Sequence, residues 1–94
     1  YGDLYVNRTA HTVSVAGNKV NLSPKEYDLL LFLIKHYGKV LSRDYILDAV
    51  WGYDYLGDLR TVDTHIKKLR AKLGDEGRHI CTVIRSGYKF ETES

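Results

Sequence analysis

The fold is decided by residues 60–73, which read RTVDTHIKKLRAKL. Four apolar residues recur in this stretch at spacings of four, three and four positions, which places them on one stripe of an α-helix. They are Val62, Ile66, Leu69 and Leu73. Because successive helical residues are turned by about 100°, the opposite face collects basic and small side chains: Arg60, Thr64, Lys67, Lys68 and Ala71, with Thr61 at its edge. The pattern predicts a helix over residues 60–73, ended by Gly74, with an apolar inner stripe and a basic outer face.

A second, shorter helix is predicted before this one. Ser42 is a suitable N-cap, and apolar residues follow it at helical spacing until Trp51 and Gly52 end the element. Residues 53–58 combine turn-forming residues with aromatic side chains, so they predict a loop between two helices. Asp58 is a candidate cap for the helix that follows.

The first helix has the clearest beginning. Residues 23–26, Ser-Pro-Lys-Glu, predict a capping box in which Ser23 and Glu26 each bond to the other's backbone, with proline at the first helical position. The next residues, 27–34, are apolar on nearly all sides, so this helix is expected to be buried on most of its surface. Gly38 is expected to end it as a left-handed C-cap.

Strands are predicted on both sides of the helices. Three alternating or β-branched segments near the N-terminus predict a small antiparallel sheet with a tight hairpin at Gly17-Asn18. These segments are residues 4–6, 12–15 and 20–22. Residues 80–84 and 88–90 flank a turn with a basic residue at its tip, which predicts a C-terminal β-hairpin, or wing. The order of sheet, three helices and hairpin predicts an α+β fold of the winged helix-turn-helix kind in one domain, residues 1–94, excised from a longer chain.

Composition and motifs argue against several classes of protein. With one cysteine, Cys81, the chain forms no intramolecular disulfide, which fits a reducing intracellular compartment. Because no apolar run is long enough to cross a bilayer, a cytoplasmic protein without a membrane partner is expected. No nucleophile elbow, phosphate-binding glycine loop or paired zinc ligands occur, and His79 lies near Cys81 without a second pair. The chain is therefore predicted to be no enzyme and to hold no cofactor or metal.

The charge distribution suggests a polyanionic partner. Residues 1–59 carry a balance of −1, whereas residues 60–94 carry +3. A helix of this kind suits the major groove, where lysine and arginine reach phosphates or guanine and small residues approach thymine methyls. The wing offers further contacts to phosphates or a minor groove, through Arg85, Ser86 and Lys89.

Plainer explanations exist for each of these features. A basic helix face also serves solubility. Asp63 would pair with Lys67 one helical turn away, and His65 would be a solvated or hydrogen-bonded imidazole. Trp51 and Phe90 are expected in the core. Two other functions stay open, a winged-helix module that binds protein through the aromatic loop and a binder of nucleic acid without sequence preference.

Several motifs follow one another in an order that resembles the effector domain of the OmpR/PhoB family of bacterial response regulators. They are Leu-Ser-Pro-Lys-Glu-Tyr at 22–27, Leu-Leu at 30–31, Leu-Ser-Arg at 41–43, Val-Trp-Gly at 50–52, Arg-Thr-Val-Asp-Thr-His-Ile at 60–66, Leu-Arg-Ala-Lys-Leu at 69–73, Thr-Val at 82–83 and Gly-Tyr at 87–88. The resemblance covers essentially all 94 residues. Residues 60–66 and 69–73 are the parts most specific to that family.

The resemblance implies a transcription factor that binds direct promoter repeats as a head-to-tail dimer. A receiver domain before this chain would be phosphorylated by a cognate histidine kinase. By position, the residues at DNA would be Arg60, Thr61, Thr64, Lys67, Lys68 and Arg70, with Thr82 and Tyr88 in the wing. RNA polymerase would contact the loop at residues 51–59, through Trp51, Tyr53, Asp54, Tyr55, Leu56 and Asp58.

The wing departs from the family pattern at one position. The family reads Thr-Val-Arg-Gly, whereas this chain reads Thr-Val-Ile-Arg at residues 82–85. Ile84 therefore stands at the arginine position, and a cation follows at Arg85. Alternation along a strand would put Arg85 on the opposite side from residue 84 unless the turn re-aims it. Arg85 is still expected to contact DNA.

Overall fold

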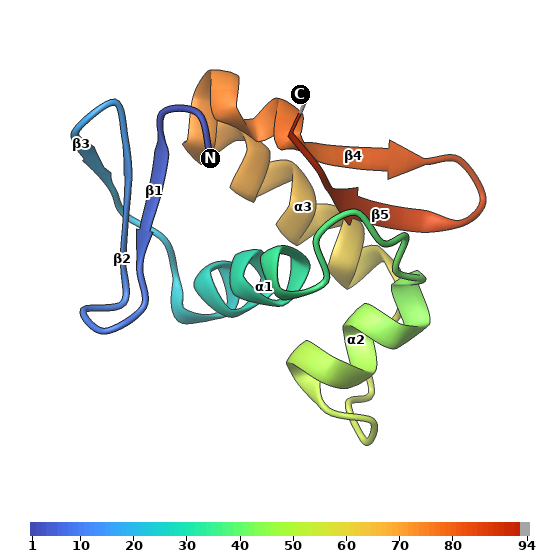
Figure 1. The fold of residues 1–94 in the computed structure, drawn as a ribbon. Helices are drawn as coiled ribbons and strands as arrows, with labels where there is room; N and C mark the ends of the chain where they lie inside the picture. The colour runs from blue at the N-terminus through green and yellow to red at the C-terminus, as the bar shows by residue number, and fades with distance from the viewer. Residues whose placement is uncertain (93–94) are drawn as a thin grey trace.

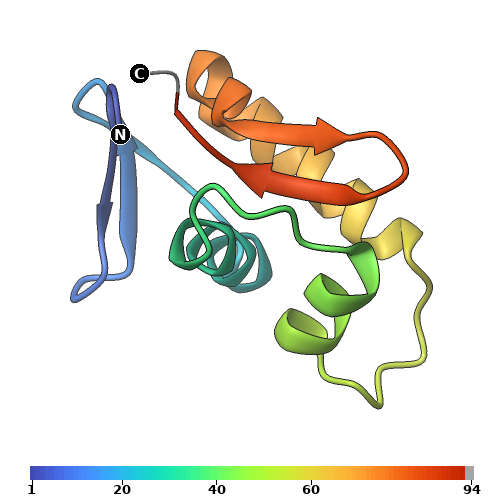
Figure 2. The same cartoon turned by 45° about the vertical axis from the view of Figure 1, so that its right-hand side comes forward.

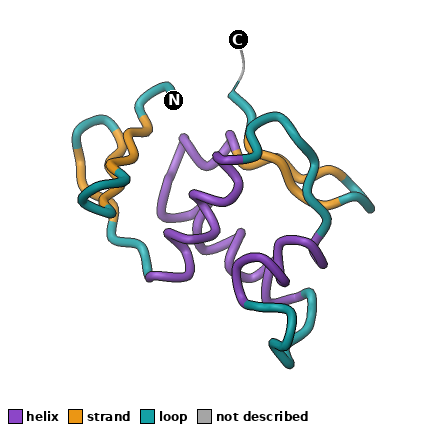
Figure 3. Tube along the Cα trace, turned by 60° about the horizontal axis from the view of Figure 1, so that its bottom comes forward, coloured by secondary structure: helices purple, strands orange, loops and turns teal. Residues whose placement is uncertain are grey.

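The computed structural model describes residues 1–92 and confirms the predicted order of sheet, three helices and hairpin (Figure 1). The elements are β1 (Leu4–Asn7), β2 (Thr12–Val15), β3 (Asn18–Val20), α1 (Pro24–Lys35), α2 (Arg43–Trp51), α3 (Arg60–Leu73), the 3₁₀ helix η1 (Gly74–His79), β4 (Ile80–Val83) and β5 (Gly87–Phe90). The sheet β1–β2–β3 stands at one end, α1 and α3 lie in the middle, and α2 lies at the other end (Figure 3). The hairpin β4–β5 runs along α3 (Figure 2).

The hydrophobic core lies between the helices. α1 contributes Leu29, Leu30 and Leu33, which have no exposed surface, and the hairpin contributes Phe90. The four stripe residues of α3 are also buried, with at most 1% of their surface exposed, as the spacing predicted. Burying each such side chain contributes about 1.5–3 kcal/mol. This packing fixes which face of α3 points away from the core.

Hydrogen bonds at the starts of α1 and α2 confirm the predicted N-caps at Ser23 and Ser42. Ser23 Oγ accepts the Glu26 backbone N–H at 3.2 Å, and Glu26 Oε1 accepts the Ser23 N–H at 2.8 Å. Ser42 Oγ accepts the Tyr45 N–H at 3.1 Å. α1 ends differently from the prediction, because its C-cap is His36 and the left-handed Gly38 comes two residues later.

The turn between β2 and β3 lies one residue earlier than predicted. Val15 pairs with Asn18, so the two-residue loop consists of Ala16 and Gly17, with φ of 52° and 83°. Two left-handed residues give a turn whose twist matches the flanking strands. Asn18 therefore belongs to β3, and that strand ends at Val20.

The hairpin is held by the backbone of the segment that connects α1 to α2. Leu41 and Tyr88 exchange two backbone hydrogen bonds, at 2.8 and 3.0 Å, and Gly38 N–H donates to Phe90 O at 2.9 Å. Gly87 has φ of 135°, and a Cβ there would overlap the carbonyl group of Leu41. Only glycine allows the two backbones to approach this closely.

Two carboxylates are buried with basic partners. Lys72 Nζ of α3 donates to Glu26 Oε1 of α1 at 2.6 Å, and Glu76 Oε2 lies 2.6 Å from His79 Nε2. Burial acts to raise the pKa of Glu26, but the hydrogen bonds from Lys72 and Ser23 outweigh it and lower that pKa. The pKa of Glu76 is lowered in the same way, since its bond with His79 and the Arg78 charge outweigh burial.

No helix within residues 1–92 combines the length and the apolar character needed to cross a membrane.

We expect Gly87→Ala to destabilise the domain far more than Gly74→Ala. Gly74 also has a positive φ, of 60°, but nothing lies within 4 Å of its missing Cβ. Alanine there should cost only backbone strain, about 1–3 kcal/mol, because φ of 60° with ψ of −131° lies in a region that glycine almost alone adopts. Gly87→Ala must also displace the Leu41 carbonyl group and should cost at least about 2 kcal/mol more. Urea unfolding of both variants measures the difference. Equal free energies of unfolding would contradict the close approach.

The domain should lose stability in acid through Glu26. A lowered folded pKa gives stability that is present above the ordinary value of 4.5 and is lost as the pH falls through the folded pKa. Glu26→Gln keeps an acceptor for the capping box but removes the charge that faces Lys72. We expect this variant to be less stable at pH 7 and to lose less stability below pH 4.5, measured by urea unfolding across pH. Asp28→Asn, at an exposed position of α1, is the matched control; an unchanged acid profile in Glu26→Gln would refute this role.

Candidate nucleic-acid interface

The outer face of α3 carries the side chains that the sequence assigned to it. Arg60, Thr64, Lys67, Lys68 and Ala71 are exposed, and Thr61 is half-buried at the edge. Within residues 1–92, the ammonium groups of Lys67 and Lys68 form no ion pair. A helix that presents free cations beside small side chains can approach a polyanion closely.

Arg60 is held at the start of α3 by Asp58. Asp58 Oδ1 accepts the Arg60 backbone N–H at 2.9 Å, and Oδ2 accepts from the guanidinium at 3.0 and 3.2 Å. These bonds lower the pKa of Asp58. The predicted N-cap at Asp58 is therefore wrong in position, because Leu59 holds the N-cap of α3 without a side-chain cap bond, although Asp58 does accept the N–H of the first helical residue. Because this ion pair is exposed to solvent, Arg60 can exchange it for another anion.

Arg70 lies on the side of α3 that faces the hairpin. Its Nε and Nη2 donate to the Ile80 carbonyl oxygen at 3.0 and 2.7 Å, and Nη2 also donates to Thr82 Oγ1 at 2.7 Å. The guanidinium carbon lies 5.7 Å from the centre of the Tyr88 ring. Arg70 therefore ties α3 to β4 and β5. The helical period does not reveal this role, because the partners are ten or more residues away.

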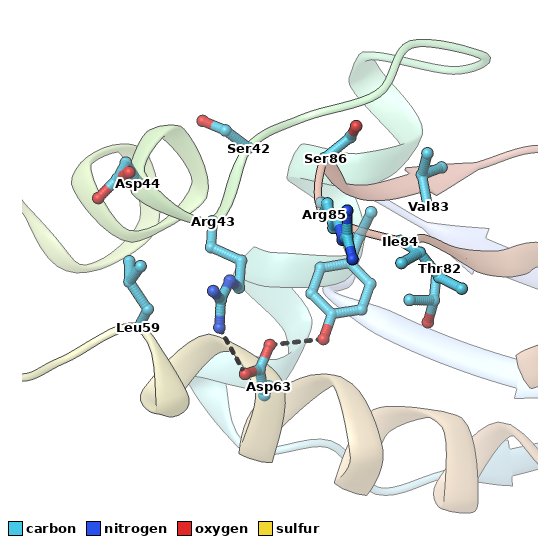
Figure 4. Close-up of a pocket in the computed structure, with 12 residues that line it drawn as sticks. Ser42, Arg43, Asp44, Leu59, Asp63, Thr82, Val83, Ile84, Arg85 and Ser86 are labelled. Atoms are coloured by element: carbon cyan, nitrogen blue, oxygen red, sulfur yellow. Dashed lines mark hydrogen bonds and ion pairs between the residues drawn. The ribbon is translucent and has the colours of Figure 1, made fainter.

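Asp63 joins α3 to two other elements, as Figure 4 shows. Its Oδ2 accepts from Arg43 Nη1 of α2 at 3.0 Å, and its Oδ1 accepts the Tyr88 hydroxyl of β5 at 2.5 Å. The expected pairing with Lys67 is wrong, because Asp63 points towards α2 and the hairpin rather than along the outer face. Burial, together with the hydrogen bond to Asp63, raises the pKa of Tyr88 to about 12, so its hydroxyl remains a donor at neutral pH.

A groove of about 400 Å³ separates the start of α2 from the turn of the wing. Its lining includes Arg43, Asp63, Thr82 and Arg85 (Figure 4). Tyr88 also lines it but is only 8% exposed, whereas Thr82 is exposed. The wing of this chain thus presents Thr82 on its surface and keeps Tyr88 largely inside.

The turn of the wing contains residues 84 and 85, at which the sequence departs from the family pattern. Both residues lie in the loop between β4 and β5, closed by a bond from Ser86 N–H to Val83 O at 2.9 Å. Arg85 has a φ of 67°, so strand alternation does not decide its direction. Ile84 has 81% of its surface exposed. An apolar side chain and a cation therefore stand together at the tip.

The loop between α2 and α3 exposes apolar side chains. Leu56 is fully exposed and Tyr53 is 89% exposed. Trp51 is half-buried and packs edge-on against His65, with ring centres 4.9 Å apart. His65 Nδ1 lies 2.9 Å from Thr61 O, which confirms a hydrogen-bonded imidazole. Leu56 and Tyr53 are thus exposed apolar side chains on the loop, outside α3.

Comparison with known proteins places this chain among transcriptional regulators. The family model described as "Transcriptional regulatory protein, C terminal" matches residues 17–90. The chain is 47% identical over 95 residues to the transcriptional regulatory protein ResD of Bacillus subtilis, an alignment that covers 97% of the chain and 40% of ResD. The chain therefore spans about two fifths of the length of that relative.

Solved structures agree with this comparison. The response regulator DrrB, an OmpR/PhoB homologue from Thermotoga maritima, is 36% identical with a TM-score of 0.89, covering 98% of this chain and 43% of DrrB. The DNA-binding domain of Klebsiella pneumoniae RstA, solved in complex with the RstA box, is 35% identical with a TM-score of 0.85, covering 97% and 93%. This chain belongs to the family of C-terminal DNA-binding domains of OmpR/PhoB response regulators.

Proposed function

We propose that this chain is the output domain of a two-component response regulator, and that it binds specific promoter sequences with α3 in the major groove. The observation that carries the proposal is the outer face of α3, whose free cations stand beside small side chains and are backed by a fully buried stripe. The related RstA domain, of similar fold, was solved on its DNA box. Regulation of transcription, rather than catalysis, is the function of this family.

The proposed contacts divide between helix and wing. On α3, bases and phosphates are contacted by Arg60, Thr61, Thr64, Lys67 and Lys68. In the wing, Thr82 and Arg85 reach the backbone or the minor groove. Arg70 and Tyr88 are engaged within the domain, so we assign them to holding the wing in place at the DNA surface.

The partners of the whole regulator are part of the proposal. Relatives such as ResD are more than twice as long as this chain, which leaves room for a receiver domain phosphorylated by a cognate histidine kinase. Two copies bind direct repeats head to tail, and the protein acts in the cytoplasm, where bacterial promoters are found.

The loop between α2 and α3 is the proposed contact for RNA polymerase. Leu56 and Tyr53 are its most exposed apolar side chains, and apolar groups exposed in this way favour a protein partner. The carboxylate of Asp54 and the aromatic rings of Trp51 and Tyr55 complete that surface, whereas Asp58 bonds to Arg60.

Selection of bound duplexes from a random pool by the purified domain tests the proposal. We expect a recurring half-site of about 6–7 base pairs, repeated one helical turn apart and bound well above a scrambled duplex at physiological salt. A pool without enrichment and with steep salt dependence would instead indicate a binder without sequence preference. Absence of any DNA binding would favour a protein-interaction module acting through the loop.

Lys68→Ala should weaken binding to the selected site by about 1–3 kcal/mol and relax the preference at one base pair, if Lys68 contacts a base. Lys19→Ala is the matched control, because Lys19 is an exposed lysine on β3, away from α3. Titration of the selected and scrambled duplexes measures both effects. Equal losses on the two duplexes would assign Lys68 to a phosphate.

Leu56→Ala should leave DNA binding and thermal stability unchanged, because the side chain is fully exposed. We expect it to reduce transcription from a promoter that the regulator activates, measured with purified polymerase and the whole regulator. Val40→Ala, at an exposed apolar residue before α2, serves as the control. Full activation of transcription by the Leu56 variant would show that Leu56 does not contribute to the proposed contact with RNA polymerase.

A further inference from the structure

Asp63 is an acid in the midst of the proposed DNA contacts. On α3 it comes three residues after Arg60 and immediately before Thr64, on the side that faces α2 and the groove beside the wing. A carboxylate in such a place opposes binding by electrostatic repulsion. We therefore expect a role of Asp63 within the protein rather than in attracting DNA.

The two oxygens of Asp63 are used by two different elements. Arg43 belongs to the first turn of α2, and Tyr88 belongs to β5 of the wing. One carboxylate thus connects the helix before the loop, the recognition helix α3 and the wing (Figure 4). The negative charge of Asp63 is also partly offset by the Arg43 guanidinium, 3.0 Å away.

The two bonds differ in strength. The ion pair with Arg43 is exposed to solvent on both sides, 43% and 38%, so salt weakens it. Tyr88 as a whole residue is only 8% exposed, and a bond from a hydroxyl to a carboxylate is short and strong. Tyr88 is therefore the more important partner.

The bond to Tyr88 acts near the tip of the wing. Leu41 pairs with the backbone of β5, and Arg70 bonds to the Ile80 carbonyl and to Thr82 of β4. Neither Leu41 nor Arg70 belongs to the first turn of α3, which begins at Arg60. Only Asp63, among the described residues, joins the first turn of α3 to the wing through a hydrogen bond between side chains.

We propose that Asp63 is a positioning residue that sets the sequence preference of DNA binding rather than its strength. By holding Tyr88 and Arg43 at once, it fixes the angle between α3 and the wing so that both engage one site together. This inference rests on the proposed function, because it presumes that α3 and the wing contact the same DNA.

The test compares Asp63→Ala, Tyr88→Phe and Tyr37→Phe. Tyr88→Phe removes only the hydroxyl and keeps the ring beneath Arg70. Tyr37→Phe removes another tyrosine hydroxyl that bonds to the C-terminal segment, at Thr92 Oγ1, away from the groove, and is the matched control. Affinities for the selected and scrambled duplexes are measured at a temperature at which every variant is folded.

We expect Tyr88→Phe to lower the ratio of selected to scrambled affinity about ten-fold, the scale expected when a bond to a charged group is lost. Asp63→Ala should lower this ratio at least as much while binding scrambled DNA more tightly than the parent, because a negative charge is gone. A merely structural residue would lower both affinities together. Tyr37→Phe should match the parent.

Three results would overturn the inference. An unchanged ratio in Tyr88→Phe would show that the hydroxyl bond does not set preference. Relaxation at a single base pair in Asp63→Ala, with none in Tyr88→Phe, would show that Asp63 contacts a base itself. Parallel loss on both duplexes in both variants would show a structural role alone.

A measurement without DNA separates this inference from the proposed function. Residual dipolar couplings of the β4 and β5 amides are fitted to the alignment of α1 and α3. In Tyr88→Phe we expect the measured couplings of the hairpin to disagree with those calculated from the alignment of α1 and α3, because the hairpin has changed its orientation. In Tyr37→Phe we expect them to agree as they do in the parent. Agreement in Tyr88→Phe as well would overturn the positioning role. If the parent domain shows no sequence preference while the couplings change as expected, the proposed function fails and the structural step of the inference stands.

Discussion

Burial of one stripe of α3 against α1 is the constraint on which the rest of the molecule depends. Four side chains of α3 have almost no exposed surface, so the helix cannot rotate about its axis without exposing apolar surface to water. The outer face is thereby fixed. Lys67 and Lys68 face outward because the opposite side of the helix is packed into the core, and not because their own ammonium groups make contacts.

The wing depends on a second constraint, which comes from the backbone. Leu41 pairs with Tyr88, and Gly87 makes room for the Leu41 carbonyl group. The segment that joins α1 to α2 therefore lies beside β5, to which it is bonded by an isolated bridge at Leu41 and by Gly38. Because that segment leads directly into the Ser42 cap, the position of α2 is linked to that of the wing. The helices and the wing are thus joined through the backbone of the segment between α1 and α2.

Local patterns in the sequence predicted the elements well, because their causes are local. The capping box at Ser23 and the stripe of α3 involve residues within a few positions of one another, and both were found as predicted. The turn after β2 was misplaced by one residue, since strand pairing, not glycine alone, sets its register. The partners of Asp63 could not be predicted, because Arg43 and Tyr88 lie 20 and 25 residues away.

Two aspartates near the start of α3, Asp58 and Asp63, affect how well such a domain distinguishes one DNA sequence from another. Asp58 engages Arg60, and Asp63 engages Arg43, so part of the positive charge near the start of α3 is neutralised within the protein. Attraction to phosphates is the same for every sequence, and lowering it reduces binding to unrelated DNA. On the proposed mode of binding, discrimination then rests on geometry, because the outer face of α3 and the wing must both fit the same DNA site. On this argument, the modest net charge of +2 favours selectivity, since it leaves discrimination to shape and base contacts.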